Sequence, residues 1–338
     1  MKNFFLIFLI FFLFIGCLSD RYEIKDGKRE PVLLREFDDN AKGHLFWSSL
    51  KDQNGKYIKE NKKEILFDST RDTFIYVHGW QGVGYFGWTT HSIMTGPGFF
   101  LGPIAIMISM MYNVPGGGAM IAEFKKRQAD FNTSVFDWQE YNSIADDYET
   151  SQNLPLLEKN LKENPKDWPL LPKNLSDEIE LFVTETNYQK DIYLVCHSLG
   201  NQVVIRAYNM MPKKVQERIK LIVLLDPFTT NYYNYMSKKL NVDTDWIAGS
   251  TNGWVKDELI DLIKKNELKD KLVVIPSSDI GKNWVDDIAT PLELKVIDNT
   301  KEVPVDGFYA LRTKILHDKI VDKFFIEGKF DEELGIKK

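Results

Sequence analysis

Short runs of apolar residues alternate with longer helical patterns along most of the chain. A short apolar run predicts a strand that is buried on both faces, and apolar residues every three to four positions predict an amphipathic helix. The clearest helical patterns cover 175–184 and 201–211. The predicted strands cover 44–49, 65–68, 74–77, 134–136, 191–196, 220–225, 271–275 and 292–297. This alternation predicts an α/β fold in which helices flank a mostly parallel central sheet.

Two stretches do not fit the alternation. Residues 92–120 are largely apolar and contain Gly and Pro, which predicts either a buried helical hairpin or a mobile apolar lid. Residues 142–173 are charged and rich in Pro, which predicts an excursion from the main fold. Residues 18–42 are polar without a regular period and are interpreted as a tether. One domain is therefore expected over 43–330, followed by a C-terminal tail at 331–338.

The N-terminus has the pattern of an export signal. An uninterrupted apolar run over 4–15 follows Lys2 and is shorter than the roughly 20 residues of a membrane-spanning helix. It leads into Gly16-Cys17, which resembles a bacterial lipobox, where the Cys is lipidated and becomes the mature N-terminus. We expect a lipoprotein signal peptide over 1–17 and a membrane-anchored protein of the bacterial cell envelope, on the periplasmic or outer face. The alternative is an ordinary signal peptide and a secreted protein.

Composition excludes several classes of protein. The formal charge of −6 argues against a nucleic-acid binder, which needs a concentrated basic surface. Two Cys residues, Cys17 and Cys196, cannot form a disulfide framework or a Cys-rich zinc site. No group of His, Cys and carboxylate residues has metal-ligand spacing along the chain, so we expect no metal and no organic cofactor. The sequence gives no indication of the oligomeric state.

The strongest chemical signal is the segment Cys196-His197-Ser198-Leu199-Gly200. A predicted strand runs directly into it, and a predicted helix follows at once. A small-x-Ser-x-Gly turn in this position holds the Ser in a tight, strained turn that exposes its hydroxyl above the sheet. The helix N-terminus and the Leu199 N–H favour negative charge beside Ser198. The pattern therefore predicts a Ser nucleophile, with Cys196 as a structural residue at a position where Gly is usual.

Four segments at predicted strand ends resemble the α/β-hydrolase fold, in its lipase and esterase branch. They are Val77-His78-Gly79-Trp80, Val135-Phe136-Asp137-Trp138, the segment 196–200, and Leu224-Leu225-Asp226-Pro227. The resemblance covers about 43–330. It implies a serine carboxylic ester hydrolase that acts through an acyl-enzyme. The apolar stretch over 92–120 would then suit apolar acyl esters or lipids as substrates, and the lipid anchor would hold the enzyme at a membrane.

The nucleophile needs a base, and the base needs an orienting acid. Four of the five His residues are assigned elsewhere by their positions: His44, His78, His91 and His197. His317 remains, after the last predicted strand and just before a predicted terminal helix. The order Ser, acid, His along the chain is the order of this fold. His317 is therefore predicted to be the base.

Two carboxylates compete for the role of the acid. Asp226 follows the strand over 220–225 and precedes Pro227, and the resemblance to lipases favours it. Asp279 follows the next strand, where most other members of the fold carry the acid, and Asp306 is a third candidate. The predicted oxyanion hole consists of the backbone N–H groups of Leu199 and Trp80.

Two other functions share these features. The chain could be a non-catalytic lipoprotein that keeps the scaffold for binding, because Cys196 departs from the usual motif. An acyltransferase or a peptidase could also use the same triad, since the chemistry up to the acyl-enzyme is shared.

Overall fold

The computed structural model describes about half of the chain. The described residues are 22–25, 28–31, 44–47, 59–60, 63–64, 69–79, 130–137, 170–229, 254–305 and 309–336, with the single residues 232, 235 and 239. Several predictions lie outside these ranges and concern the signal peptide with Cys17, the apolar stretch over 92–120, Trp80, His91 and Asp306.

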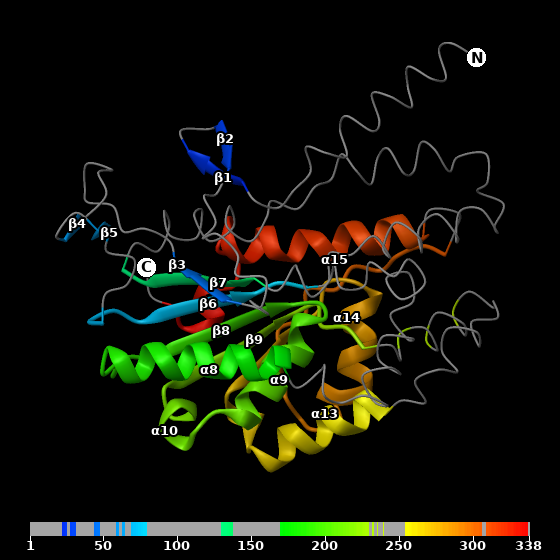
Figure 1. Ribbon diagram of the computed structural model, residues 1–338. Helices are drawn as coiled ribbons and strands as arrows, with labels where there is room; N and C mark the ends of the chain where they lie inside the picture. Colours follow the sequence, from blue (N-terminus) through cyan, green and yellow to red (C-terminus); the bar gives the residue numbers. More distant parts are fainter. Residues whose placement is uncertain are drawn as a thin grey trace, which may run out of the picture.

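A seven-stranded sheet forms the centre of the described structure (Figure 1). Its strand order is β11-β10-β9-β8-β6-β7-β3. The strands are β3 (His44–Trp47), β6 (Thr73–Val77), β7 (Asn132–Asp137), β8 (Ile192–His197), β9 (Ile219–Leu225), β10 (Leu272–Ile275) and β11 (Lys295–Val296). All neighbouring pairs are parallel except β3, which runs antiparallel to β7. The predicted α/β fold with a mostly parallel sheet is confirmed.

Two short antiparallel pairs lie outside this sheet. They are β1 (Tyr22–Lys25) with β2 (Lys28–Pro31), and β4 (Lys59–Glu60) with β5 (Lys63–Glu64). The first pair falls within the stretch that the sequence predicts to be a tether. Asp26 and Gly27 separate its strands in the sequence, and Asp-Gly is a favoured two-residue hairpin connection. The dipeptide Asp26-Gly27 was the signal in the sequence for this hairpin.

Helices cover both faces of the sheet. Figure 1 shows α8, α9 and α13 on one side and α15 on the other. The helices are α8 (Leu170–Glu185), α9 (Gly200–Met210), α10 (Lys213–Gln216), α13 (Trp254–Lys265), α14 (Asp279–Trp284), α15 (Tyr309–Phe325) and α16 (Asp331–Leu334). A 3₁₀ turn covers Leu268–Asp270, and a π-helical turn over Val285–Ala289 extends α14. Within the described ranges, none of the helices is both long and apolar enough to cross a membrane.

Helix α8 begins inside the predicted Pro-rich excursion. The excursion was expected to end at residue 173, but the helix already starts at Leu170 and includes Pro172. Pro is tolerated in the first turn of a helix because N–H groups there have no partner within the helix. The sequence pattern therefore underestimated the length of this helix at its N-terminal end.

Alternate residues of the strands pack into two separate cores. In β6, Ile75 and Val77 pack with residues of α8, α9 and α13, whereas Phe74 and Tyr76 pack with residues of α15. The Tyr76 ring lies 4.8 Å from the ring of Phe325 on α15. Strands that are buried on both faces have nearly continuous apolar sequences, which is why the apolar runs located them well.

The C-terminal residues belong to the folded domain. The sequence predicted a tail over 331–338, but residues 331–334 form α16, and the side chain of Ile336 is buried. Ile336 and Phe330 pack in the same core as α15. The segment 331–338 has few apolar residues, so its pattern did not reveal that Ile336 is anchored in this core.

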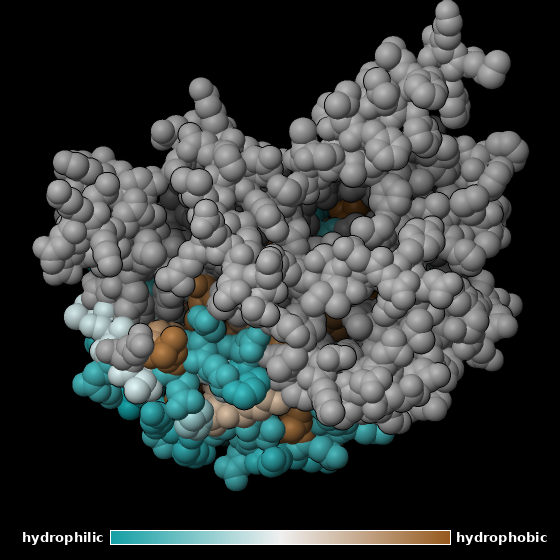
Figure 2. Space-filling view, in the orientation of Figure 1, coloured by the Kyte–Doolittle hydropathy of each residue, from teal (hydrophilic) through white to brown (hydrophobic). Residues whose placement is uncertain are grey.

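The face shown in Figure 2 is predominantly hydrophilic where described residues reach the surface. Brown apolar positions are scattered among teal ones over the lower helices. The exposed large apolar side chains among the described residues are Leu181, Met210, Val305 and Ile326. Isolated apolar side chains of this kind are normal on a protein surface and do not indicate a binding site.

Candidate active site

Ser198 occupies a strained turn between β8 and α9. Its φ angle is 52°, in the left-handed region that costs an L-residue roughly 1–2 kcal/mol. The strand ends at His197, and the helix begins at Gly200. The Ser198 N–H donates to the Leu225 carbonyl at 3.1 Å, which ties the turn to the end of β9. A strained Ser at a strand-to-helix turn has the geometry of a nucleophile elbow.

The end of β6 packs directly against this turn. A Cβ atom on Gly79 would lie 2.7 Å from the Ser198 Cβ, and one on Gly200 would lie 2.6 Å from the Val77 carbonyl oxygen. Real Cβ atoms essentially never approach so closely, so both positions require Gly. The buried His78 Nδ1 donates to the Gly79 carbonyl at 2.7 Å. The structure therefore brings these three predicted motif residues together at Ser198.

We expect Gly200→Ala to lower the free energy of unfolding by about 1–3 kcal/mol, the usual cost of overpacking. The new Cβ would meet two backbone carbonyls, those of Val77 and His78, which cannot move as a flexible side chain can. Urea denaturation measures the change. Gly335→Ala is the matched control, because its Cβ would meet open space and only its positive φ of 68° resists the change. An equal or larger loss in the control would contradict the packing argument.

Cys196 is a structural residue in this geometry. Its side chain is fully buried, and Sγ points to the Val223 carbonyl at 3.5 Å. Burial raises the pKa of this thiol well above its usual value. A buried, protonated thiol is a poor nucleophile. The Ser of the turn is therefore the group available for nucleophilic chemistry here.

Asp226 lies at the end of β9, next to the strand that carries Ser198. Its carboxylate is fully buried and accepts four hydrogen bonds. Oδ1 accepts from the backbone N–H groups of Ser277 and Ser278, at 2.6 and 2.9 Å. Oδ2 accepts from the Ser278 hydroxyl at 2.5 Å and from His317 Nδ1 at 2.6 Å. Burial alone would raise the Asp226 pKa, but the hydrogen bond and charge of His317 and the hydrogen bonds from Ser278 keep that pKa below its ordinary value.

His317 lies within α15 and not before it, which corrects the prediction that it precedes the terminal helix. The helix turn that carries it is held on the sheet by two side chains. The Ser277 hydroxyl donates to the Leu316 carbonyl at 2.8 Å, and His197 Nε2 donates to the His317 carbonyl at 2.9 Å. Because Nδ1 of His317 donates to Asp226, its Nε2 is the nitrogen that can act as a base.

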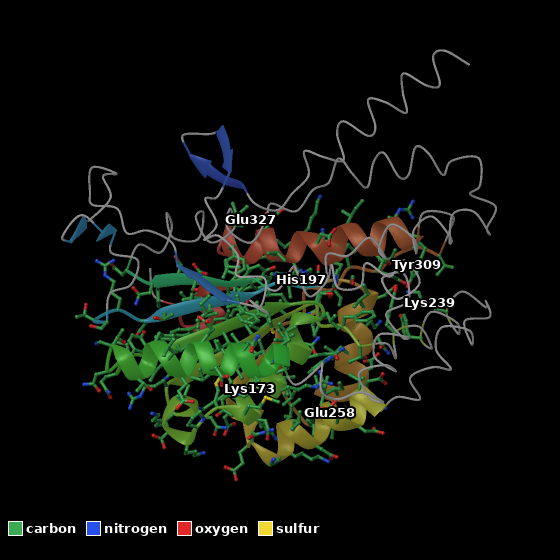
Figure 3. All side chains as sticks on the ribbon, in the orientation of Figure 1. Lys173, His197, Lys239, Glu258, Tyr309 and Glu327 are labelled. Atoms are coloured by element: carbon green, nitrogen blue, oxygen red, sulfur yellow. The ribbon has the colours of Figure 1, made fainter. Side chains whose placement is uncertain are left out.

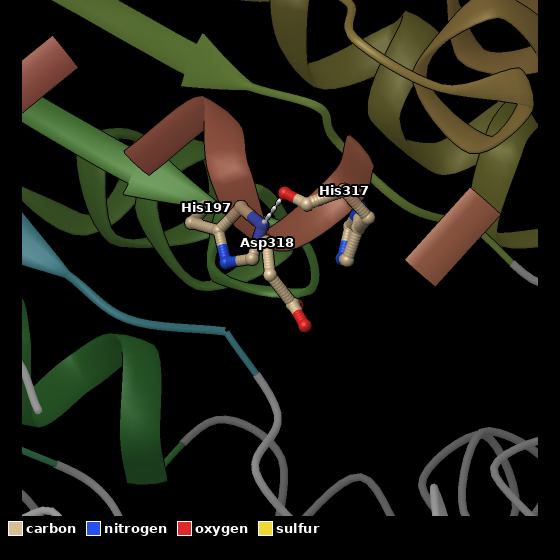
Figure 4. A group of neighbouring side chains, drawn as sticks. All are labelled: His197, His317 and Asp318. Atoms are coloured by element: carbon tan, nitrogen blue, oxygen red, sulfur yellow. Dashed lines mark hydrogen bonds between the residues drawn. The ribbon is translucent and has the colours of Figure 1, made fainter. Parts of the chain in front are cut away.

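The rings of His197 and His317 are in contact. Their centroids are 4.4 Å apart (Figure 4), and His197 immediately precedes Ser198. The middle of α15 therefore lies beside the carboxyl ends of β8 and β9. No hydrogen bond joins Ser198 Oγ to His317 among the described residues. In many enzymes this bond tightens only in the complex with substrate.

Asp279, the alternative acid, has different partners. Its carboxylate pairs with Lys239 Nζ at 2.6 Å and accepts from the Tyr309 hydroxyl at 2.6 Å. Figure 3 shows Lys239 and Tyr309 close together at one end of α15, and Lys239 lies 5.2 Å from the Tyr309 ring centroid. Asp279 therefore links α14, the first turn of α15 and residue 239, whereas Asp226 bonds to His317.

Of the two predicted oxyanion donors, Leu199 lies among the described residues. Leu199 directly follows Ser198, and within the described part of the chain no group accepts its backbone N–H. Trp80 lies outside the described residues, but Gly79 immediately before it contacts Ser198. The first residues after β6 thus lie against the turn at Ser198.

Sequence reasoning missed four residues that build this site: Asn201, Ser277, Ser278 and Gly281. Asn201 Nδ2 donates to the carbonyls of Ser198 and Phe228, at 2.5 and 3.0 Å, and so joins the turn to the loop after β9. Ser278 also caps α14 by accepting from the Ile280 N–H at 3.1 Å. A Ser-Ser-Asp start of a helix after a strand was the available signal.

Among the residues that the structure describes, one group of side chains could hold a metal ion. His197, His317 and Asp318 each offer one ligand atom, and these atoms lie within 4.8 Å of one another (Figure 4). The two His side chains are buried, and Asp318 is half-buried. The prediction that the protein has no such group rested only on the spacing of residues along the chain. These residues come together only because α15 packs against the end of β8.

A mostly parallel sheet flanked by helices, a strained Ser turn between a central strand and a helix, and a His317–Asp226 bond beside the ends of these strands occur together in this chain. This arrangement is the α/β-hydrolase fold. No family model matches the chain, and no curated protein matches it in sequence.

Solved structures match it at low identity. Est1E from Butyrivibrio proteoclasticus is 12% identical with a TM-score of 0.37, over 90% of this chain and 97% of that one. A structure described with carboxylesterases of the thaumarchaeon Nitrososphaera gargenis is 8% identical with a TM-score of 0.38, over 88% and 95%. A 1H-3-hydroxy-4-oxoquinoline 2,4-dioxygenase is 11% identical with a TM-score of 0.38, over 86% and 95%. Similarity at this level does not transfer an activity from one protein to another.

Proposed function

We propose that the chain is a serine hydrolase that cleaves carboxylic esters through an acyl-enzyme. The observation that supports this most is the hydrogen bond from His317 to the buried Asp226, at the sheet edge where Ser198 is held at a φ of 52°. A base that is oriented by a carboxylate beside a strained Ser is the combination that nucleophilic acyl transfer requires.

In the first half of the reaction, Ser198 Oγ attacks the ester carbonyl carbon while His317 Nε2 takes the hydroxyl proton. The tetrahedral intermediate then breaks its bond to the alcohol oxygen, which receives the proton from His317. In the second half, a water molecule attacks the acyl carbon and gives its proton to the same nitrogen. The bond to Oγ breaks, Ser198 regains a proton, and the carboxylic acid leaves. Asp226 stabilises the imidazolium that forms in each half.

The developing oxyanion requires two backbone donors. We propose the N–H groups of Leu199 and Trp80 for this role, since Leu199 opens α9 and the residue before Trp80 contacts Ser198. The N-terminal end of α9 adds a favourable dipole at the same point. No metal or organic cofactor takes part in this scheme.

We propose apolar acyl esters or lipids as substrates, on the basis of the apolar residues 92–120. To test the activity, the full-length chain is incubated with p-nitrophenyl esters of increasing acyl length and, separately, with a fluorophosphonate probe. We expect hydrolysis and covalent labelling, with the probe mapped to Ser198 by mass spectrometry. Absence of both would refute the hydrolase and favour a binding protein on this scaffold. Labelling without ester hydrolysis would favour a peptidase or an acyltransferase.

We also propose that Cys17 is lipidated and anchors the protein to a membrane of the bacterial cell envelope. The basis is the apolar run that ends in Gly16-Cys17. Expression in a bacterium with labelled palmitate should yield labelled protein in the membrane fraction. Cys17→Ala should lose the label, and unchanged labelling of this variant would refute the anchor.

Gly281 on α14 provides a test of the Asp226 environment. A Cβ atom at this position would lie 2.2 Å from Asp226 Oδ1 and 3.0 Å from the Pro276 Cα. We expect Gly281→Ala to displace the carboxylate and to lower kcat by about 10²-fold, the typical cost of a misplaced catalytic group. Lys282→Ala, an exposed position on the same helix, is the control and should keep kcat near wild type. Equal rates in the two variants would contradict the role of this contact.

A further inference from the structure

His197 connects the residue proposed as the base to the residue proposed as the nucleophile. Its Nε2 donates to the backbone carbonyl of His317 at 2.9 Å (Figure 4), and it directly precedes Ser198 in the chain. We propose that His197 is a positioning residue, which sets the place of His317 relative to Ser198, and that Ser277 supports the same turn of α15. This role rests on the proposed function and adds to it the side chains that align its two reacting groups.

The packing of α15 on the sheet leaves this alignment to be fixed by other contacts. The apolar side chains of α15 that pack against the sheet are Ile320, Val321, Phe324 and Phe325. Apolar attraction is non-directional, whereas a hydrogen bond weakens steeply once its distance or angle is lost. The hydrogen bonds to residues 316 and 317 therefore restrict the shift and rotation of the helix more narrowly than its apolar contacts do.

Two elements of the sheet supply these bonds. His197 ends β8, and Ser277 lies between β10 and α14. The Ser277 hydroxyl donates to the Leu316 carbonyl at 2.8 Å, one residue before the carbonyl that His197 binds. The Ser277 backbone N–H also donates to Asp226 Oδ1 at 2.6 Å, so this residue holds the acid and the helix of the base together.

The His197 ring is itself held in place. It is buried, and its partner is a carbonyl oxygen, which only accepts, so Nε2 carries the hydrogen. The end of β6 confines the other side of the ring, because a Cβ atom on Gly79 would lie 3.3 Å from Nδ1. The contact with the His317 ring, with centroids 4.4 Å apart, confines it further. A side chain can position another group precisely only when its own rotamer is fixed in this way.

A peptide bond and a hydrogen bond thus connect the backbones of Ser198 and His317. The bond from His317 Nδ1 to Asp226 orients the imidazole, but it does not fix where the helix places that ring relative to the nucleophile. A displacement of about 1 Å at a reacting group costs about 10²-fold in rate. Loss of one of the two bonds to α15 should therefore lower kcat about tenfold, with little change in KM.

Steady-state hydrolysis of a p-nitrophenyl ester by full-length variants tests this role. His197→Phe keeps an aromatic ring against His317 but has no N–H, and it should lower kcat about tenfold with KM within about twofold of wild type. His197→Gln places an amide N–H the same number of bonds from Cβ as the imidazole Nε2. It should recover most of the rate that the Phe variant loses.

Ser277→Ala removes only the hydroxyl that binds the Leu316 carbonyl, because the backbone N–H to Asp226 remains. It should also lower kcat about tenfold. Ser176→Ala is the matched control and should keep the wild-type kcat. It removes another buried hydroxyl, on α8, which covers the face of the sheet opposite α15 (Figure 1).

Three kinetic results would overturn the proposal. They are a kcat in His197→Phe and Ser277→Ala equal to that of Ser176→Ala, an equal loss in the Gln and Phe variants, and a raised KM at unchanged kcat. Circular dichroism verifies the fold of each variant. If His197→Phe does not fold, the comparison of Ser277→Ala with Ser176→Ala decides.

The proton between His317 Nδ1 and Asp226 provides a measurement that needs no ester hydrolysis. A proton in a short bond to a buried carboxylate gives a downfield ¹H NMR resonance, which is assigned by its absence in His317→Gln. We expect faster exchange with water to broaden it in His197→Phe, and His197→Gln to restore it. An unchanged resonance in His197→Phe would overturn the positioning role. These changes in a protein that never hydrolyses esters would refute the proposed function and leave the positioning of His317 standing.

Discussion

Ser198→Ala abolishes ester hydrolysis, with an expected loss of about 10⁴-fold or more in kcat. The reason is that the acyl-enzyme forms on Ser198 Oγ, and no other side chain at this turn can replace it. Cys196 is fully buried with a raised thiol pKa. Single-turnover hydrolysis of a p-nitrophenyl ester measures the rate. A rate within tenfold of wild type would contradict the assignment of the nucleophile.

The strain at Ser198 provides a control that separates loss of chemistry from loss of structure. Ala at this position keeps the φ of 52°, so the melting temperature should stay near wild type. Gly has no steric penalty at positive φ, and Ser198→Gly should therefore be more stable by about 1 kcal/mol and equally inactive. Thermal unfolding of the three proteins measures this order. A destabilised Gly variant would show that the turn stores no strain.

Asp226→Asn lowers kcat by about 10⁴-fold with little change in KM, the size of effect expected when a triad acid becomes an amide. The carboxylate accepts the His317 Nδ1 proton and thereby presents Nε2 as the base. An Asn side chain can donate to Nδ1, which places the ring proton on the wrong nitrogen. Steady-state kinetics with the same ester measures both parameters.

Asp279→Asn is the matched control for this variant. It removes the ion pair that links α14 to Lys239 and weakens the bond from Tyr309 that links α14 to α15. We expect a lower melting temperature and a kcat within about tenfold of wild type, because Asp279 lies outside the bond to His317. If Asp279→Asn lost all activity and Asp226→Asn retained it, Asp279 and not Asp226 would be the acid that orients His317.

The sequence alone located the strands of the central sheet and the turn at Ser198. Strands in a parallel sheet are buried on both faces, and so their apolar runs are visible without knowledge of their neighbours. The turn was recognisable because Ser198, with its φ of 52°, and Gly200 lie within a few consecutive residues between a strand and a helix. These features are local, and local patterns report them directly.

Tertiary packing decided which side chains meet. Asp226 and Asp279 both follow apolar strands, and only the position of α15 across the sheet brings His317 to Asp226 and Tyr309 to Asp279. The same packing places His197 against His317 and buries Ile336. A pattern along the chain records the propensity and burial of each segment. It does not record the distance between segments that lie about a hundred residues apart, because that distance is determined by the order of strands and the path of a helix over them.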